Sequence, residues 1–461
     1  MTDNQVRQPP SLRYAWYVVI VLMLCYTLSF VDRQIMGFLV GPIKQDLNVS
    51  DTRVGLLGGL AFAIFYTVLG LPMGRLADSK SRRAIIAFGV IFWSIMTATC
   101  SLAKSFWTLF AARIGVGVGE ATLAPAAFSL ISDYFPKEKL AKALSVYSMG
   151  ILIGSGLASI LGGAIVQAVT KLPVVDVPLL GEMAPWRLTF IAVGFPGILV
   201  ALLLFTVREP VRHNLMLDAS GNAATLAVSE VVAQIRLRWT SVLGVSFGMA
   251  CQSLCNYAVV FWAPPFFARV HHWEPAQTGL ALGLTTIIAG CAGLFVGGSL
   301  CDRWLRQGLR ESPLKVGMIG VMGAGVALML AFSASDARWT VALLAPGFFF
   351  LGFPIGSAYA SLQWIFPNQV RGVVSALLIF ILNLFGLTLG PFLPGFFNDY
   401  LFHDELMVGK SIVLTLAIAT VIGAALFRGT YASYAKHHAM LEDGTGAAGR
   451  WTAGQKEGSV A

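Results

Sequence analysis

Charged residues are scarce in this chain. They make up 12% of its 461 residues, whereas hydrophobic residues make up 56%. A soluble globular domain carries about 25% charged residues, so this composition excludes an ordinary soluble protein. Apolar residues also occur in long uninterrupted runs, which indicates a protein that crosses a membrane many times.

The sequence lacks the residue patterns that several functions require. The sequence contains no G-x-x-x-x-G-K-[ST] motif, so no phosphate-binding loop supports ATP-driven pumping. We expect neither a metal nor another cofactor, and no enzymatic activity. The six cysteines lie in or next to the apolar runs without companion ligands and are interpreted as packing residues. All six histidines lie in loops or near the ends of these runs, so a proton pathway through the middle of the membrane must use carboxylates. The histidines are His213, His271, His272, His403, His437 and His438.

Uncharged runs of about 20 residues predict twelve membrane-spanning helices. We therefore expect an all-α membrane protein of two pseudo-symmetric six-helix bundles, at 1–207 and 239–433, joined by a linker at 208–238 and followed by a tail at 434–461 that we expect to be disordered. The expected spans are 15–40, 53–73, 83–103, 107–132, 142–166, 187–207, 240–267, 277–301, 315–333, 339–363, 372–398 and 411–429.

Most lysines and arginines outside the spans fall in segments that lie on one side if both termini are cytoplasmic. The net charge of +9 follows from this asymmetry, because basic loops face the anionic inner leaflet, and it does not indicate nucleic-acid binding. We expect a monomer in the plasma (inner) membrane.

The linker carries apolar residues at near-helical spacing. Leu226, Val231, Ile235 and Trp239 recur beside Arg236, a pattern typical of an amphipathic helix lying on the inner membrane surface. An ordinary tether that happens to contain apolar residues is the alternative.

Four ionic residues lie away from the ends of the expected spans: Asp32, Arg33, Arg113 and Glu120. A charge inside a membrane costs several kcal/mol unless it is paired or hydrated, so such residues usually serve function. The alternative is a buried structural ion pair. We assign proton coupling to Asp32 and Glu120, and binding of a substrate head-group to Arg113 and Arg33.

Spacing predicts how these groups meet. Arg113 and Glu120 are seven residues apart, so they share one helix face about 10 Å apart along the axis. Asp32 and Arg113 lie at similar depth if the first and fourth spans are neighbours, which predicts an Asp32–Arg113 pair above Glu120. Competition for the arginine between this carboxylate and a substrate anion would then couple transport to protonation.

The second half has no comparable charges. Its expected cavity residues are neutral, which favours an amphiphilic substrate whose head is held by the first half; simple packing of these side chains is the alternative. They are Gln252, Asn256, Tyr257, Trp262, Phe353, Tyr359 and Gln363.

A short basic turn follows the second span and recurs, degraded, after the eighth. It resembles the loop between helices 2 and 3 of the major facilitator superfamily. We expect Asp78 to face the start of the eleventh span near Gly372, Asp302 to face the start of the fifth near Leu140, and Arg82 and Arg83 to hold a carboxylate or lipid phosphates, as an inner gate; a plain positive-inside loop is the alternative. The gate residues are Gly74, Asp78, Arg82, Arg83, Asp302 and Arg303.

Further segments resemble the spinster family of this superfamily. They are Phe30-Val31-Asp32-Arg33, Gly55-Leu56-Leu57, Phe65-Tyr66, the run from Arg113 to Ala121, Ser132-Asp133-Tyr134-Phe135-Pro136 and Trp262-Ala263-Pro264. The resemblance implies proton-linked transport of sphingolipids or lysophospholipids. An organic-anion or sugar-phosphate symporter is the nearest alternative, and a receptor or scaffold that does not transport is a distant one.

Overall fold

The computed structural model describes residues 11–173, 175–177, 181–210 and 228–442. In this part of the chain, twelve helices are long and apolar enough to cross a membrane, and each overlaps one expected span. The all-α prediction is therefore confirmed, with one short exception. Strands β1 (Val175–Val177) and β2 (Gly181–Met183) form an antiparallel hairpin between α8 and α9.

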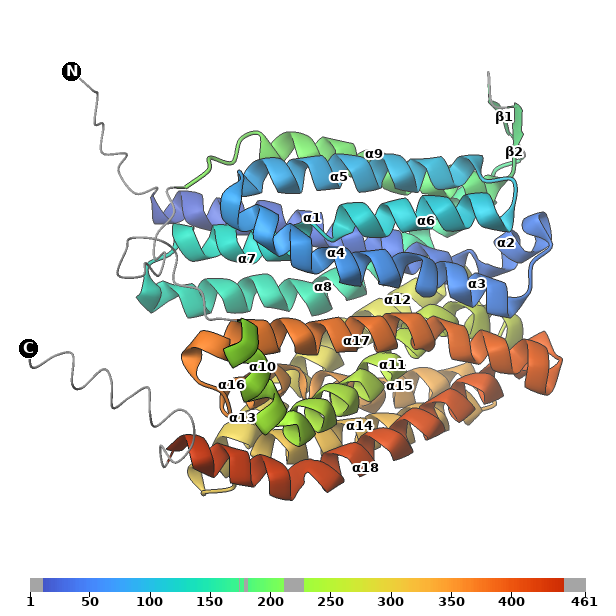
Figure 1. The fold of residues 1–461 in the computed structure, drawn as a ribbon. Helices are drawn as coiled ribbons and strands as arrows, with labels where there is room; N and C mark the ends of the chain where they lie inside the picture. Colours follow the sequence, from blue (N-terminus) through green and yellow to red (C-terminus); the bar gives the residue numbers. More distant parts are fainter. Residues whose placement is uncertain (1–10, 174, 178–180, 211–227, 443–461) are drawn as a thin grey trace, which may run out of the picture. The chain divides into compact units, whose positions relative to one another are not determined.

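The described residues divide into two compact units, of which unit 1 comprises 11–49, 61–210 and 273–283. Its long helices run alongside one another, with α5 next to α6 and α9, and α1 next to α8 (Figure 1). Its helices are α1 Leu12–Phe38, α2 Val40–Leu47, α4 Leu60–Ser79, α5 Arg82–Thr99, η1 Cys100–Leu102, α6 Phe106–Glu120, α7 Leu123–Tyr134, α8 Lys137–Thr170, α9 Pro185–Leu204 and most of α12 Pro275–Thr285.

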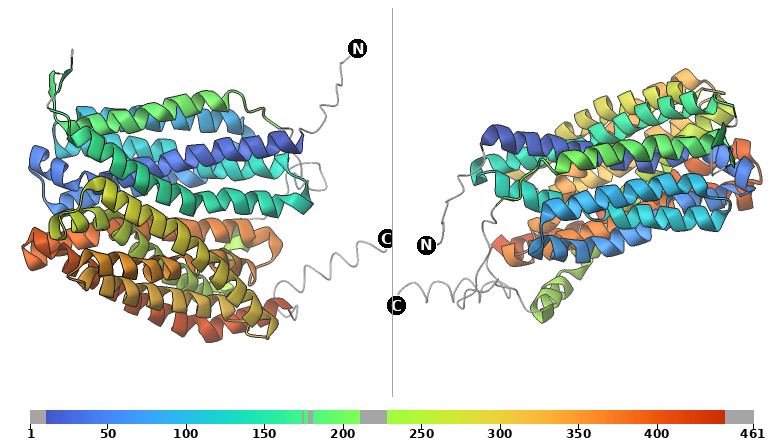
Figure 2. Two further views of the ribbon diagram at one scale, coloured as in Figure 1. Left: turned by 180° about the vertical axis from the view of Figure 1, so that it is seen from behind. Right: turned by 90° about the horizontal axis from the view of Figure 1, so that it is seen from above.

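Unit 2 comprises residues 50–60, 228–272 and 284–442. Helix α11 packs between α17 and α18 (Figure 1), and α14 packs on α15 and α18 (Figure 2). Its helices are α3 Asp51–Gly58, α10 Val228–Leu237, α11 Trp239–Val270, η2 Thr286–Gly290, α13 Cys291–Arg306, α14 Ser312–Ser333, α15 Ala337–Gly352, α16 Ile355–Gln363, α17 Asn368–Phe397, η3 Asn398–Phe402, η4 Glu405–Met407 and α18 Val408–Glu442.

Helix breaks interrupt two of the spans near their middle. Helix α6 ends at Glu120 and α7 begins at Leu123, and Pro125 cannot donate to the carbonyl of Ala121 four residues earlier. Helix α15 likewise gives way to α16 at Pro354. Both breaks leave backbone carbonyls without their helical donor, and such breaks are tolerated in membranes where other groups satisfy the backbone.

The linker contains a helix where the apolar spacing predicted one. In α10, Val231 and Ile235 pack against the buried core of unit 2, whereas Val232 and Leu237 are exposed. Leu226 lies outside the described residues. Contact of this helix with a membrane surface stays a prediction.

Candidate functional site

The intramembrane charges of unit 1 form one buried cluster around Glu120. This carboxylate ends α6 and is 1% exposed. Its Oε2 atom accepts hydrogen bonds from the Ser29 hydroxyl at 2.5 Å and from Arg33 Nε at 2.6 Å, and Arg33 Nη2 lies 2.6 Å from the same oxygen. Glu120 is thus paired with Arg33, a partner that the spacing did not predict, because it placed an Asp32–Arg113 pair above Glu120.

Three aromatic rings surround the Arg33 guanidinium. Its carbon lies 5.4, 4.7 and 4.5 Å from the ring centres of Phe30, Phe62 and Tyr66. Such contacts stabilise a cation that has lost water, by about 0.5–2 kcal/mol each. The rings and the carboxylate together explain how an arginine can lie inside a membrane span.

Phe62 also brings the second arginine into the cluster. The Arg113 guanidinium lies 5.7 Å from the same ring, and its Nη1 donates to the main-chain carbonyl of Asp32 at 3.2 Å. The spacing predicted contact with the Asp32 carboxylate instead. The predicted proximity of residues 32 and 113 holds, but this hydrogen bond goes to the backbone.

Glycines permit this close arrangement of α6. A Cβ atom on Gly117 would lie 2.5 Å from the carbonyl oxygen of Phe62, and one on Gly119 would lie 2.7 Å from Cβ of Trp93. No larger residue fits without displacing the neighbouring helices. The glycine run therefore sets Arg113 and Glu120 against α4 and α5.

Several polar atoms of the cluster have no hydrogen-bond partner among the residues that the structure describes. They are Asp32 Oδ1, Glu120 Oε1, and Arg113 Nε and Nη2. Asp32 is 2% and Arg113 0% exposed, so both are shielded from bulk solvent. Buried polar atoms without partners are costly, and these offer acceptors for a proton and donors for an anion.

The neutral residues expected in unit 2 have varied surroundings. The Trp262 indole donates to the carbonyl of Pro391 at 2.7 Å and is fully buried, and Phe353 packs in a core cluster with Cys301 and Val316. Both are therefore packing residues in this structure, contrary to the cavity prediction. Asn256 and Tyr257 are partly buried, Gln363 is exposed, and the side chain of Tyr359 lies outside the described residues.

Gln252 has a structural task that the sequence did not suggest. Its Nε2 atom donates to the carbonyls of Phe350 and Leu351, at 3.0 and 3.3 Å. The first of these carbonyls lacks its helical donor because Pro354 has no N–H. Gln252 thus provides a hydrogen-bond donor for the carbonyls at the helix break. Its Oε1 atom has no hydrogen-bond partner among the described side chains and backbone groups.

The sequence matches the profile of the Major Facilitator Superfamily over residues 22–391. The chain belongs to this superfamily. It is 31% identical to an MFS-type efflux pump of Mycolicibacterium smegmatis, across 92% of this chain and 94% of the relative. It is 27% identical to protein spinster homolog 1 of Homo sapiens, across 89% of this chain and 80% of the relative.

Solved structures agree. A bacterial homologue of the human lysosomal transporter Spinster, in an inward-facing and unoccupied conformation, has a TM-score of 0.76, 27% identity and coverage of 94% of this chain and 99% of that chain. A D-xylose–proton symporter has a TM-score of 0.61 at 17% identity, with 88% and 97% coverage, and shows the fold alone. The resemblance to the spinster family is confirmed, and this chain is a transporter of the superfamily related to spinster.

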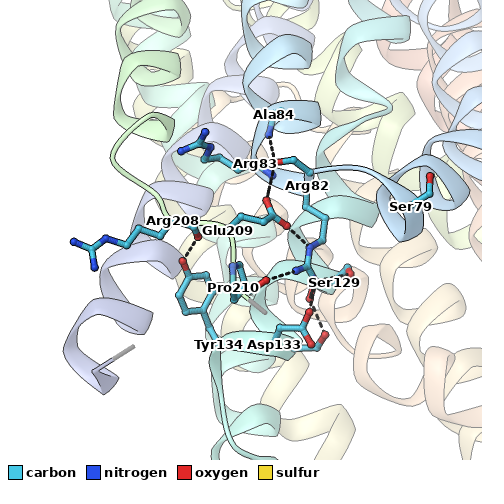
Figure 3. A network of polar contacts seen from close by, with 12 residues as sticks. Ser79, Arg82, Arg83, Ala84, Ser129, Asp133, Tyr134, Arg208, Glu209 and Pro210 are labelled. Atoms are coloured by element: carbon cyan, nitrogen blue, oxygen red, sulfur yellow. Dashed lines mark hydrogen bonds and ion pairs between the residues drawn. The ribbon is translucent and has the colours of Figure 1, made fainter. Parts of the chain in front are cut away.

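The loop typical of the superfamily is anchored inside unit 1 (Figure 3). Arg82 is 1% exposed, and its guanidinium contacts the Asp133 carboxylate and, through Nε at 2.8 Å, Glu209. It also donates to the backbone at Ser129 and Pro210, at 3.1 and 3.3 Å. A buried guanidinium with these partners does not present itself to lipid phosphates, so that expectation for Arg82 is wrong in this structure.

Glu209 holds the same loop from its other side. Its Oε2 accepts from the Ser81 hydroxyl and from the main-chain N–H of Arg83, both at 2.9 Å. Burial raises the pKa of this carboxyl, but the Arg83 N–H, the Arg82 guanidinium and the Ser81 hydroxyl outweigh burial, and its pKa lies below the ordinary value of 4.5. Glu209 is therefore ionised and hydrogen-bonded at neutral pH.

The other expected gate residues are less informative. Asp302 and Arg303 are exposed on unit 2, and the Asp78 side chain lies outside the described residues. Gly74 lies on α4, where an added Cβ atom would lie 3.9 Å from Cβ of Pro125, an ordinary contact distance. The Asp78 and Asp302 gate contacts stay predictions.

Sequence reasoning missed the neutral members of the cluster. Ser29, Phe62 and Tyr66 carry no charge, so the search for intramembrane ions passed over them. Ser29 lies four residues before Arg33, on the same helix face, and this spacing was the available signal. No such signal exists for Phe62 and Tyr66 of α4, because the residue spacing within one helix does not show which other helix it contacts.

Proposed function

We propose that this protein is a proton-coupled secondary transporter that moves an amphiphilic, lipid-like substrate by alternating access. The observation that carries the proposal is the buried cluster of unit 1, in which Glu120 and Arg113 have partner-free polar atoms. A carboxylate and a guanidinium whose polar atoms lack hydrogen-bond partners suit a site that binds a proton together with an anionic head-group. We propose lysophospholipids or sphingolipids as the substrate class, which the resemblance to the spinster family implies.

The ion pair suggests how coupling works. Protonation of Glu120 removes the charge that holds Arg33, and the released guanidinium can bind a substrate anion together with Arg113. Loss of the proton restores the Arg33–Glu120 pair and lowers the affinity for the anion. Binding of substrate and proton thereby favour one another, as reciprocal linkage requires.

The neutral character of the residues expected in unit 2 supports an amphiphile over a small dianion. A sugar phosphate or dicarboxylate would be stabilised by further basic groups, but Gln252, Asn256 and Tyr257 carry no charge. A proton-coupled organic-anion or sugar-phosphate symporter remains the alternative. We propose that both termini lie in the cytoplasm.

Reconstitution separates these possibilities. Purified protein in liposomes is expected to exchange labelled lysophosphatidylcholine or sphingosine against an internal pool, and small anions are not expected to compete. In Glu120→Gln, uptake driven by a pH gradient is expected to be lost while exchange persists, because exchange needs no net proton transfer. Glu182→Gln, at an exposed position of strand β2, is the control. Undiminished pH-driven uptake in Glu120→Gln would refute the coupling role, and competition by sugar phosphates alone would refute the lipid substrate.

A further inference from the structure

Three arginines among the described residues are almost fully enclosed by the protein. Arg82 is 1% exposed, Arg113 0% and Arg238 1%. Arg82 contacts two carboxylates, and Arg113 shares its cluster with the carboxylates of Asp32 and Glu120. For Arg238, in unit 2, burial of the guanidinium lowers the pKa, and no carboxylate of the described residues acts to raise it. A buried cation without an anion is costly, so an anion bound at Arg238 would stabilise unit 2.

Arg238 lies at the junction between α10 and α11. Helix α10 packs beside α11 and α17 (Figure 1), and its residues Val231 and Ile235 hold it against the core of unit 2. The N–H of Arg238 donates to the carbonyl of Ile235 at 3.1 Å, and its carbonyl accepts from the N–H of Val242 at 3.0 Å. These bonds fix the arginine at the level where α11, one of the candidate membrane spans, begins.

Neutral groups contact the Arg238 guanidinium. Its Nη1 atom donates to the amide oxygen of Gln234 at 2.5 Å, and its carbon lies 5.2 Å from the centre of the Phe366 ring. Its Nε atom has no hydrogen-bond partner in the described part of the chain. Gln234 is partly exposed, so solvent reaches the side chain that covers the guanidinium. Hydrogen bonds to a charged acceptor are about twice as strong as those to a neutral one, so an anion can replace this amide.

Further positive charge lies around the junction. His437 of α18 is bound to the first turn of α11 by a hydrogen bond of 2.8 Å between its Nδ1 atom and the Ser241 hydroxyl. The charges of Arg238 and of the exposed Lys436 both act on this ring. No described side chain caps the first turn of α11, so the positive end of the helix dipole adds to these charges. The junction therefore favours a ligand with net negative charge over a zwitterion.

The surface beside Arg238 carries large apolar side chains. Leu237 is 46% exposed, Trp239 57% and Leu243 41%. Trp239 and Leu243 are four residues apart, so they share one face of α11. Tryptophan is enriched where a span meets the lipid head-groups. Acyl chains can therefore lie against this face while a lipid phosphate lies at the depth of Arg238.

We propose that Arg238 is the centre of a binding site for the phosphate group of an anionic phospholipid. A phosphate oxygen replaces the Gln234 amide on the guanidinium, and the acyl chains contact Trp239 and Leu243. In the proposed orientation this junction faces the anionic inner leaflet, where such lipids are found. The inference requires neither the proposed transport activity nor its substrate, because the bound lipid stabilises unit 2 itself.

Melting curves of the purified protein in a neutral detergent test the site. Dioctanoyl phosphatidylglycerol, which is anionic, is expected to raise the Tm of the wild type by about 5–10 °C at about 100 times its Kd. In Arg238→Met this rise is expected to be lost. Without lipid, Arg238→Met is expected to melt no lower than the wild type, because the substitution removes a buried charge that lacks an anion. Loss of the rise then reports lost binding and not a damaged fold.

A second variant acts in the opposite direction. Gln234→Leu removes the amide that competes for the guanidinium, so the lipid concentration for half of the Tm rise is expected to fall about fivefold. Arg236→Met is the matched control, because Arg236 is exposed on α10 and its loss changes the net charge equally. This control is expected to keep the rise. Dioctanoyl phosphatidylcholine, which has the same acyl chains but no net charge, is expected to leave the wild-type Tm nearly unchanged.

The outcomes are distinct. An equal rise in wild type and Arg238→Met would show that Arg238 is a packing residue and overturn the site. Equal loss of the rise in Arg236→Met would show diffuse attraction between charges and also overturn it, as would an equal rise with phosphatidylcholine. Inorganic phosphate at millimolar concentration separates the two sources of the ligand. If it alone gives the full rise, and Arg238→Met abolishes that rise, the ligand is a soluble phosphate and the lipid assignment is wrong.

Discussion

Arg82→Gln tests the anchoring of the loop between α4 and α5. The substitution removes a guanidinium that is 1% exposed and that contacts Asp133, with 7% of its side chain exposed, and Glu209, with 29% exposed. Breaking a buried ion pair costs about 3–5 kcal/mol, and the Asp133 contact falls in this class. The Glu209 contact adds less, because solvent screens that carboxylate.

A loss of this size is measurable as thermal unfolding in detergent. At about 2–4 °C per kcal/mol for a unit of this size, Arg82→Gln is expected to lower Tm by about 6–20 °C. Arg83→Gln is the control, because its side chain makes one hydrogen bond, to the Val207 carbonyl at 3.2 Å, and its N–H to Glu209 survives.

A double variant identifies the cause. Asp133→Asn combined with Arg82→Gln removes both charges, so it is expected to be more stable than the sum of the single losses. A Tm of Arg82→Gln within about 1–2 °C of wild type, on the scale of a surface change of about 0.5 kcal/mol, would refute the reasoning. Strict additivity of the two substitutions would show that the two charges are not coupled.

Glu209, Arg113 and Gln252 each give a further test. Because its folded pKa is lowered, Glu209 stabilises the fold above its ordinary pKa of 4.5, and the Tm difference between wild type and Glu209→Gln is expected to shrink as the pH falls from that value through the lowered folded pKa, in a pH series of melting curves. Arg113→Lys is expected to weaken lysolipid binding at least about tenfold in counterflow, because an ammonium cannot reproduce a planar guanidinium; wild-type affinity would show a structural role. Gln252→Leu is expected to lower Tm by leaving the Phe350 carbonyl unsatisfied, at a cost of about 1–3 kcal/mol, whereas Gln363→Leu at an exposed position is not expected to lower it.

Composition and run length predict the twelve spans well, because burial in lipid imposes the same requirement on each of them. The four intramembrane charges could likewise be found by scanning, since each violates that requirement. Their partners could not. The rise per residue of a helix gives the depth of Asp32 and Arg113 in the membrane, but it does not show which way each side chain points. The sequence therefore could not show that Arg33 pairs with Glu120.

The gate region shows a second limit of the sequence. Arg82 stands in a motif that marks the loop, yet its partner Glu209 is more than a hundred residues away and follows a different span. The sequence likewise predicts that helix α3 belongs to the first bundle, because chain order groups a segment with its sequence neighbours. In the structure, residues 50–60 belong to unit 2. The contacts of α3 with unit 2, such as the ion pair of Asp51 with Arg269 at 2.7 Å, show where it belongs.

The fourth and tenth spans occupy corresponding places in the two halves, and a proline breaks each near its middle. In the fourth, the break at Glu120 lies beside charged side chains with partner-free atoms. In the tenth, the carbonyls freed near Pro354 are satisfied by the neutral amide of Gln252. The break thus lies beside buried charged side chains in one half and beside a neutral amide in the other. A substrate that carries its charge at one end is the kind of molecule for which such divergence between repeated halves is useful, and this is the physical reason to test amphiphiles first.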